Sequence, residues 1–307
     1  MILRPKNHKE WLSARGGGIG SSEVGTILGV NPFETPYQLW RKKRGLDAPV
    51  AENFAMKAGH YLEDAVSLFY ADATGKEIIK SSKGDWLIVH DEKPFLRVSP
   101  DRTFWIPNRA KSEKNKGILE CKTTQKTIDA DDVPAHWFCQ LQYQLGVAGL
   151  EQGAIAWLTQ GRDFGFSDFD FDKDFFAFIC EEVEQFWVDC IQGGQEPPAI
   201  SVADVVAKYP KSADAEIVAS SADLDDYAKL KILKGSKKEI EDKIAEIEER
   251  IKVRMGECER MTNLADTLFS WKSASRKTFD KDKFASEHPD LFAQYVTEST
   301  SRRFLVK

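Results

Sequence analysis

The chain has 307 residues, of which 42% are hydrophobic and 30% charged. This balance excludes a disordered chain and predicts a soluble globular protein. No apolar run approaches the roughly 20 residues that cross a bilayer, and the first residues contain no apolar signal segment, so we expect neither membrane association nor secretion. The five cysteines show no CxxC or CxxH spacing, which argues against a disulfide framework or a zinc knuckle. We expect a cytoplasmic location.

Short helices are predicted in the first third of the chain. A glycine-rich turn over 16–20 precedes Ser21-Ser22-Glu23, which is typical of an N-cap with an acid in the first turn. Thr35 and Pro36 begin a further helix, because proline is favoured at the first helical position. Residues 53–73 carry apolar side chains at spacings of three and four, which predicts a long amphipathic helix.

The middle of the chain predicts a mixed domain. Residues 76–122 contain short β-type runs separated by Gly, Pro, Asp or Asn, which indicates a meander. A helix over 135–149, a hairpin within 153–169 and a long helix over 174–192 follow. The expected fold class is therefore α/β (α+β), a mixed central sheet flanked by helices.

The C-terminal third differs in composition. Residues 193–198 are a plausible linker, and residues 223–260 combine near-heptad apolar spacing with Glu/Lys pairs, which predicts one or two long helices. Residues 270–307 hold eight Lys or Arg against five Asp or Glu, although the whole chain has a net charge of −6. We divide the chain into a domain at 1–195 and a mainly helical extension at 196–307.

Two short segments carry the chemistry. Asp101 follows Ser99-Pro100 and begins one predicted strand, while Glu120 and Lys122 lie two residues apart on another. Alternation along a strand places Glu120 and Lys122 on one face and Cys121 on the other. Two carboxylates suit a hard cation such as Mg²⁺, and a lysine beside them can hold or deprotonate a water. This combination is typical of metal-assisted phosphodiester hydrolysis.

A solvated charged face is the alternative interpretation of this pattern. The apolar pair Ile118-Leu119 argues against it, because a strand with this flank is central in its sheet. Glu63 on the long helix is either a further member of the site or an exposed acid. Gln140 and Tyr143 share a face of the following helix, where ordinary surface polarity is the alternative.

A candidate anion site lies near the N-terminus. Arg15, the glycine turn and the hydroxyls of Ser21-Ser22 combine a cation, hydroxyl groups and free backbone N–H groups. The alternative is an ordinary glycine-rich turn and cap. No Gly-Lys-Ser/Thr follows the glycines, so we expect no bound nucleotide.

The order of these parts resembles the YqaJ-like viral recombinase family, in the lambda-exonuclease-like branch of the PD-(D/E)xK nucleases. The resemblance covers roughly residues 10–190 and implies a restriction-endonuclease-like core. Its motifs, in chain order, are Arg15-x-x-x-Ile19-Gly20-x-Ser22-Glu23, Gly29-x-Asn31-Pro32-Phe33-x-Thr35-Pro36, Gly59-x-x-x-Glu63, Ser99-Pro100-Asp101, Glu120-Cys121-Lys122 and Gln140-x-Gln142-Tyr143.

The resemblance also implies roles for individual residues. Lys122 would position or activate the attacking water, and Gln140 would lie near the active centre. The implied metal ligands are Asp101, Glu120, the carbonyl of Cys121, Glu63 and Asp91. The implied contacts to a 5′-phosphate and to DNA are Arg15, Ser22, Ser99 and Tyr143. The family's usual Gly after the motif Asp is replaced here by Arg102.

The implied activity is a Mg²⁺-dependent 5′→3′ exonuclease on linear double-stranded DNA, with Mn²⁺ as a substitute. It would release 5′-phosphomononucleotides and leave 3′ single-stranded tails for a single-strand annealing protein, as a phage or prophage function in a bacterial cell. The branch implies a ring-shaped trimer or tetramer. The cysteines lack the clustered spacing of an iron–sulfur site, so we expect no cluster.

Two other functions remain open at this point. One is a structure-specific or internally cutting DNA endonuclease of the same fold, and the other is a catalytically silent DNA-binding recombination partner. For the extension at 196–307, the alternatives are a helical element for packing or oligomerisation and a clamp whose basic tail contacts DNA phosphates.

Overall fold

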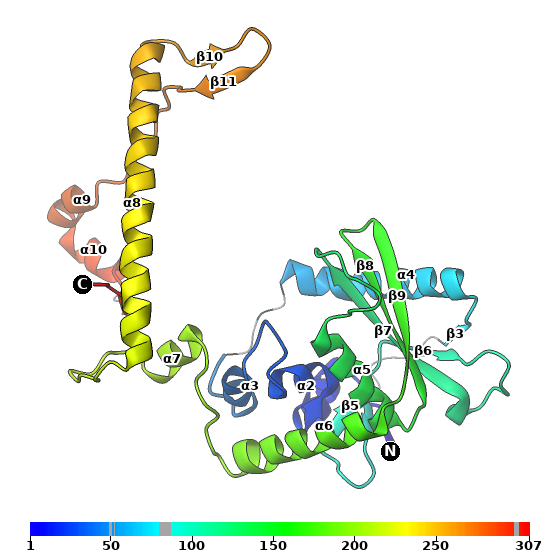
Figure 1. The fold of residues 1–307 in the computed structure, drawn as a ribbon. Coiled ribbons are helices and arrows are strands. Elements are labelled where there is room, and N and C mark those ends of the chain that lie inside the picture. Colours follow the sequence, from blue (N-terminus) through cyan, green and yellow to red (C-terminus); the bar gives the residue numbers. More distant parts are fainter. Residues whose placement is uncertain (49–50, 52, 80–86, 298–300) are drawn as a thin grey trace. The chain divides into compact units, whose positions relative to one another are not determined.

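The computed structural model describes residues 1–48, 51, 53–79, 87–297 and 301–307 (Figure 1). Residues 80–86 of the expected meander therefore lie outside the described residues. The chain divides into two units, Met1–Lys208 and Tyr209–Lys307, which are described separately. None of the helices in the described ranges has the length and apolar character needed to span a membrane.

The larger sheet of the first unit has β7 at its centre. β7 runs antiparallel to β6 and parallel to β8, and helix α5 (Ala135–Ala148) makes the crossover between the two parallel strands. This arrangement confirms the predicted mixed sheet flanked by helices. In the part of the chain that is described, the strand order is β3 (Ile78–Ile79), β6 (Arg102–Trp105), β7 (Lys116–Thr124), β8 (Gln152–Thr159) and β9 (Asp163–Asp170).

Helices cover both faces of this sheet. Helix α4 (Phe54–Thr74) packs its Val66 and Tyr70 into the core that contains Leu119 and Cys121 of β7. Helix α5 packs on the opposite face, against the core that contains Ile118. Since strand side chains alternate, Glu120 and Lys122 project to the α5 face and Cys121 to the α4 face.

A second, smaller sheet includes two of the strands expected in a single meander. β4 and β5 pair with each other in antiparallel fashion. Two short strands from the N-terminal segment complete the sheet: β1 pairs with β4, and β2 pairs with β5. The described strands follow the order β1 (Ile2–Leu3), β4 (Leu87–Val89), β5 (Leu96–Val98) and β2 (Ile19–Gly20).

Helices enclose this smaller sheet and complete the first unit. The predicted cap at Thr35 is present, since its side chain accepts a hydrogen bond from the Gln38 backbone N–H. The predicted long helix over 174–192 forms α6 and continues into a π-helical turn. The helices are α1 (His8–Gly16), α2 (Ser21–Ile27), α3 (Pro36–Lys43), η1 (Glu113–Asn115), α6 (Lys173–Gln185), η2 (Phe186–Gln192) and α7 (Val202–Lys208).

The second unit is built on one long helix, α8 (Ser221–Met255), which begins at a Ser220 capping box. A short antiparallel hairpin, β10 (Arg260–Thr262) and β11 (Thr267–Ser270), follows it and was not predicted from the sequence. Two seven-residue helices, α9 (Lys281–Glu287) and α10 (Pro289–Tyr295), lie further along the chain.

Close packing of α5 on α6 depends on Gly146. A Cβ atom at this position would lie 2.3 Å from the ring of Phe176, whereas nothing lies within 4 Å of a Cβ at Gly59 in α4. We expect Gly146→Ala to destabilise the first unit by about 1 kcal/mol or more, because overpacking outweighs the gain in helix propensity. Gly59→Ala is the matched control, and we expect it to stabilise the unit by about 0.5–1 kcal/mol. Urea denaturation measures both, and equal stabilisation by the two variants would contradict the packing.

Candidate active site

The carboxylate of Glu120 is the centre of the candidate site. It is buried, with 3% of its surface exposed, and side chains from β7 and α5 hold both of its oxygens. The Lys122 ammonium donates to Oε1 of Glu120 at 2.7 Å, and the Gln140 amide donates to the same oxygen. Gln144 donates to Oε2 at 2.8 Å. Lys122 also donates to the amide oxygen of Gln140 at 2.9 Å, so the three side chains fix one another around the carboxylate.

Asp101 lies beside this group because β6 and β7 are neighbours. Its Oδ2 accepts a hydrogen bond of 2.8 Å from the backbone N–H of Cys121. Burial and the negative charges of Glu120 and Glu63 raise the pKa of Asp101 well above its usual range. Burial, with a further contribution from Glu120, also raises the pKa of Glu63. The structure therefore brings three carboxyl groups close enough to repel one another.

Lys122 carries its proton in this environment. Burial by itself lowers the pKa of its amine, but the charges of Glu120 and Asp101 outweigh that effect and raise it. The Lys122 ammonium donates hydrogen bonds to Glu120 and Gln140 in this structure. It supplies the positive charge nearest to the buried Glu120.

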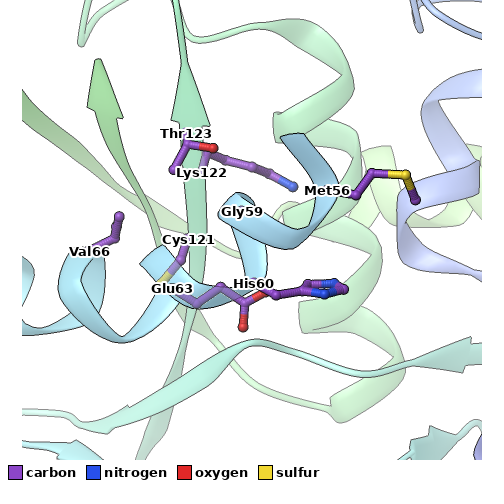
Figure 2. Close-up of a pocket in the computed structure, with 8 residues that line it drawn as sticks. All are labelled: Met56, Gly59, His60, Glu63, Val66, Cys121, Lys122 and Thr123. Atoms are coloured by element: carbon purple, nitrogen blue, oxygen red, sulfur yellow. The ribbon is translucent and has the colours of Figure 1, made fainter. Parts of the chain in front are cut away.

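A pocket of about 190 Å³ opens between α4 and the end of β7 (Figure 2). Glu63 and His60 lie on its helical wall, and Cys121 and Lys122 lie on its strand wall. The full lining is Met56, Gly59, His60, Glu63, Val66, Cys121, Lys122 and Thr123. Carboxylate and ammonium groups thus border an opening that a small ligand can enter.

Arg102, the first residue of β6, connects this strand to α4. Its guanidinium donates to Asp64 at 2.9 Å and lies 3.8 Å from the Glu63 carboxylate. It also donates to the backbone carbonyl of Asp101. The Arg102 side chain is only 17% exposed, so its positive charge forms part of the carboxyl cluster.

The candidate anion site lies next to Glu120. Arg15 donates to the Ser22 hydroxyl at 2.8 Å, and Ser22 is exposed. The Gln144 amide, which holds Glu120, also donates to the neighbouring Ser21 hydroxyl at 3.2 Å. One side chain thus connects the N-terminus of α2 to the carboxyl cluster. Ser99 is partly buried and lies between β5 and Asp101.

Two of the predicted site residues lie elsewhere. Asp91 is exposed and pairs with the amino group of Met1 at 2.6 Å. It borders a cavity shared with Lys116, which is the first residue of β7 and lies about 13 Å along the strand from Glu120. Tyr143 is fully buried, and its hydroxyl donates to the Ile19 carbonyl at 2.9 Å and accepts from the Arg97 N–H. Tyr143 therefore stabilises the smaller sheet instead of presenting a surface to DNA.

Gln144 and Ser21 also belong to the site, because the Gln144 amide donates hydrogen bonds to both Glu120 and Ser21. The sequence did not predict a role for Gln144. The spacing of Gln140 and Gln144, four residues apart, is the signal for a shared helical face. Gln142, a member of the motif, points away and bonds to the backbone of Asp170 and Asp172 instead.

The residues present suit a hard divalent cation. Within the described ranges, no three His, Cys, Asp or Glu side chains are already arranged as metal ligands. Burial raises the pKa values of Asp101 and Glu63, the negative charge of Glu120 raises them further, and a bound cation would offset that charge. Carboxylate and carbonyl oxygens are the ligands that Mg²⁺ prefers, and Oε2 of Glu120, which accepts one hydrogen bond from Gln144, has a second acceptor position. Asp101, Glu120 and the Cys121 carbonyl are therefore the groups that would hold it.

Comparison with known proteins shows which family this part of the chain is similar to. Residues 10–151 match the model of the YqaJ-like viral recombinase domain. Over these residues the chain is similar to the YqaJ-like family. It is 29% identical, over 312 aligned residues, to the uncharacterized protein YqaJ of Bacillus subtilis (strain 168), with 97% of this chain and 93% of that protein covered.

Two of the solved structures that are similar to this one are named as exonucleases. An alkaline exonuclease (LHK-Exo) from Laribacter hongkongensis has a TM-score of 0.47 and 18% identity, covering 61% of this chain and 93% of its own. A phage related exonuclease from Haemophilus somnus 129PT has a TM-score of 0.41 and 13% identity, covering 58% of this chain and 96% of its own.

The burial of Asp101, together with repulsion from Glu120 and Glu63, predicts a pH-dependent gain in stability for Asp101→Asn. Asp101 has a raised pKa in the folded protein, so its ionisation disfavours folding once the pH exceeds the unfolded value near 3.8. In the presence of a chelator, we expect the variant to have the higher Tm at about pH 8 and to lose this advantage as the pH falls toward about 4. The exposed Asp163→Asn is the control. A variant that is less stable than wild type at alkaline pH would contradict the repulsion.

Proposed function

We propose that the protein is a Mg²⁺-dependent 5′→3′ exonuclease that degrades one strand of linear double-stranded DNA from its end. It releases 5′-phosphomononucleotides and leaves a 3′ single-stranded tail. The observation that carries this proposal is the convergence of three carboxyl groups near the Lys122 ammonium. Glu120 accepts a hydrogen bond from Lys122, Asp101 accepts one from the Cys121 backbone N–H, and Glu63 lines a pocket together with Lys122. Similarity to a viral recombinase domain supports DNA as the substrate.

Each residue of the cluster has a distinct part in the proposed hydrolysis. Mg²⁺, or Mn²⁺ in its place, would supply Lewis-acid polarisation of the phosphate and a lowered pKa for the attacking water. Lys122 donates a hydrogen bond toward the reacting oxygens and stabilises negative charge that develops there. Gln140 and Glu120 hold Lys122 in place, at 2.9 Å and 2.7 Å. Arg102 and Glu63 fix the α4 side of the pocket.

The position of Arg15 supports action at a 5′ end. A terminal 5′-phosphate carries more negative charge than an internal phosphodiester, and a guanidinium beside a hydroxyl is a favourable partner for it. The Arg15–Ser22 pair reaches Glu120 through Ser21 and Gln144. A 5′-phosphate bound there would lie next to the first scissile bond.

The biological role that we propose follows from the family. A 3′ single-stranded tail is the substrate of a single-strand annealing protein, so such a protein is the partner that we propose. The setting would be phage-type recombination in the cytoplasm of a bacterial cell.

Substitution of Lys122 tests the chemistry. We expect Lys122→Ala to lower mononucleotide release from 5′-phosphorylated linear duplex by about 10²- to 10⁴-fold, because the nearest donor to the reacting oxygens is lost. The exposed Lys173→Ala at the start of α6 is the control. Release of labelled mononucleotides in Mg²⁺ is measured, with a covalently closed circle in parallel. Nicking of the circle would show that the protein is an endonuclease and not an exonuclease. Full activity of Lys122→Ala would reject the catalytic role of Lys122.

Substitution of Arg15 tests the end-binding site separately. We expect Arg15→Gln to slow digestion of the 5′-phosphorylated end by about 10- to 100-fold, the worth of a charge-assisted hydrogen bond. Digestion of an otherwise identical duplex with a 5′-hydroxyl should change little. The ratio of the two initial rates is the readout. An equal loss on both substrates would show that Arg15 supports the fold or general DNA binding instead.

A further inference from the structure

One aromatic side chain, Phe33, stands out from the loop that follows α2. It is 81% exposed, yet the loop that carries it is firmly held. The Phe33 backbone N–H donates to the Asn31 side chain at 3.0 Å, and the Asn31 amide donates to the Thr26 hydroxyl at 2.8 Å. The backbone N–H of Asn31 donates to the Gly25 carbonyl at 2.9 Å. The loop therefore presents the ring in one position, and the hydrolysis proposed above gives this ring no role.

His136 supports the Phe33 ring from the side of α5. The two ring centroids lie 6.1 Å apart with their planes at 81°, which is an edge-to-face contact. Burial lowers the pKa of His136, and the positive charge of Lys122 lowers it further, so the imidazole lies within electrostatic range of the candidate active site. Phe33 and His136, the aromatic pair, thus form an uncharged surface near the carboxyl cluster.

Helix α5 spaces the aromatic pair and the active site along one face. Helix α2 lies beside α5 (Figure 1), and Ser21 at its start accepts the hydrogen bond from Gln144. Further along α2, a Cβ atom at Gly25 would lie 2.7 Å from the Cβ of His136. His136, Gln140 and Gln144 follow one another at intervals of four residues, so they share a helical face and lie about 6 Å apart along the axis.

The three positions on α5 match successive parts of a DNA strand that enters by its 5′ end, and this step rests on the proposed function. Gln144 lies beside the start of α2, where the Arg15–Ser22 pair would bind the terminal phosphate. Gln140 belongs to the cluster that would hydrolyse the first phosphodiester. The aromatic pair comes next along the helix, where the second nucleotide would lie.

We propose that Phe33 binds the second nucleotide from the 5′ end by stacking on its base. Aromatic rings beside a charged site for the backbone are a common means of binding a single strand, and stacking accepts every base because each base has a π-face. The phenyl ring has neither a charge nor a hydrogen-bonding group, so a base suits it and a phosphate does not. The stacked base is separated from its complement, and its nucleotide becomes the new 5′ end after cleavage.

The test combines substitution of Phe33 with removal of single bases from the DNA. Dissociation constants of the full chain for a 5′-phosphorylated duplex are measured by fluorescence anisotropy in Mg²⁺, in the Lys122→Ala background so that cleavage is slow. We expect Phe33→Ala to weaken binding about 5- to 100-fold, the worth of one stacked base. On a duplex with an abasic site at the second nucleotide, Phe33→Ala should change little. An abasic site at the sixth nucleotide is the control and should leave the full effect.

Further variants separate stacking from packing. Phe33→Trp keeps an aromatic ring and should bind as tightly as the Phe33 chain, whereas Phe33→Leu keeps only apolar bulk and should lose most of the affinity. Phe178→Ala removes a 47% exposed ring from α6 and should have no effect on binding. Circular dichroism and the Tm should be the same for all variants at position 33, because the ring is exposed.

Two results would overturn the stacking site. One is a dissociation constant that Phe33→Ala leaves unchanged, and the other is an equal loss on all three duplexes. Full affinity of Phe33→Leu would also overturn it. Mononucleotide release by the wild-type chain tests the exonuclease separately. Dependence of the Phe33→Ala effect on the second base, without any release, would support the stacking site and reject the exonuclease. Release without that dependence would do the reverse.

Discussion

The burial of the Glu120 carboxylate is the constraint on which the rest of the first unit depends. An isolated carboxylate inside a protein is strongly unfavourable unless charge and hydrogen bonds compensate it. Here the compensation comes from Lys122 on the same strand and from Gln140 and Gln144 on α5. Helix α5 must therefore lie over the end of β7 with the face that carries Gln140 and Gln144 turned toward Glu120. In this orientation Gln144 also donates a hydrogen bond to Ser21 at the start of α2.

Local features of the site were predictable from the sequence because they depend on periodicity. Glu120 and Lys122 share a face since they lie two apart on a strand, and the apolar residues before them place that strand at the centre. The long helix that carries Glu63 follows from its apolar spacing. The hairpin over β8 and β9 was also predicted, and Gln160 and Gly161 at its turn adopt the positive φ values of 51° and 70° that a tight turn requires.

Features that depend on distant residues were not predictable in the same way. The division of the meander between two sheets arises because β4 and β5 find partners in the N-terminal segment. The burial of Tyr143 and the position of Asp91 likewise depend on the tertiary fold, which no local pattern encodes. The role of Gln144 could not be predicted, because it depends on the packing of α2 beside α5, which brings Ser21 next to this side chain. The β10–β11 hairpin was not predicted, because its short strands show no clear alternation of apolar and polar residues around a recognisable turn.

Arg102 supplies a counter-ion that is covalently attached to the fold. A dissolved cation leaves a carboxyl cluster when its concentration in solution falls. The Arg102 guanidinium cannot leave, because it is part of the chain and pairs with Glu63 and Asp64. Part of the charge at this end of the sheet is thus neutralised whatever the ionic composition of the solution. The contact between α4 and β6 therefore survives while the protein is free of metal, and the carboxyl cluster is assembled before any cation arrives.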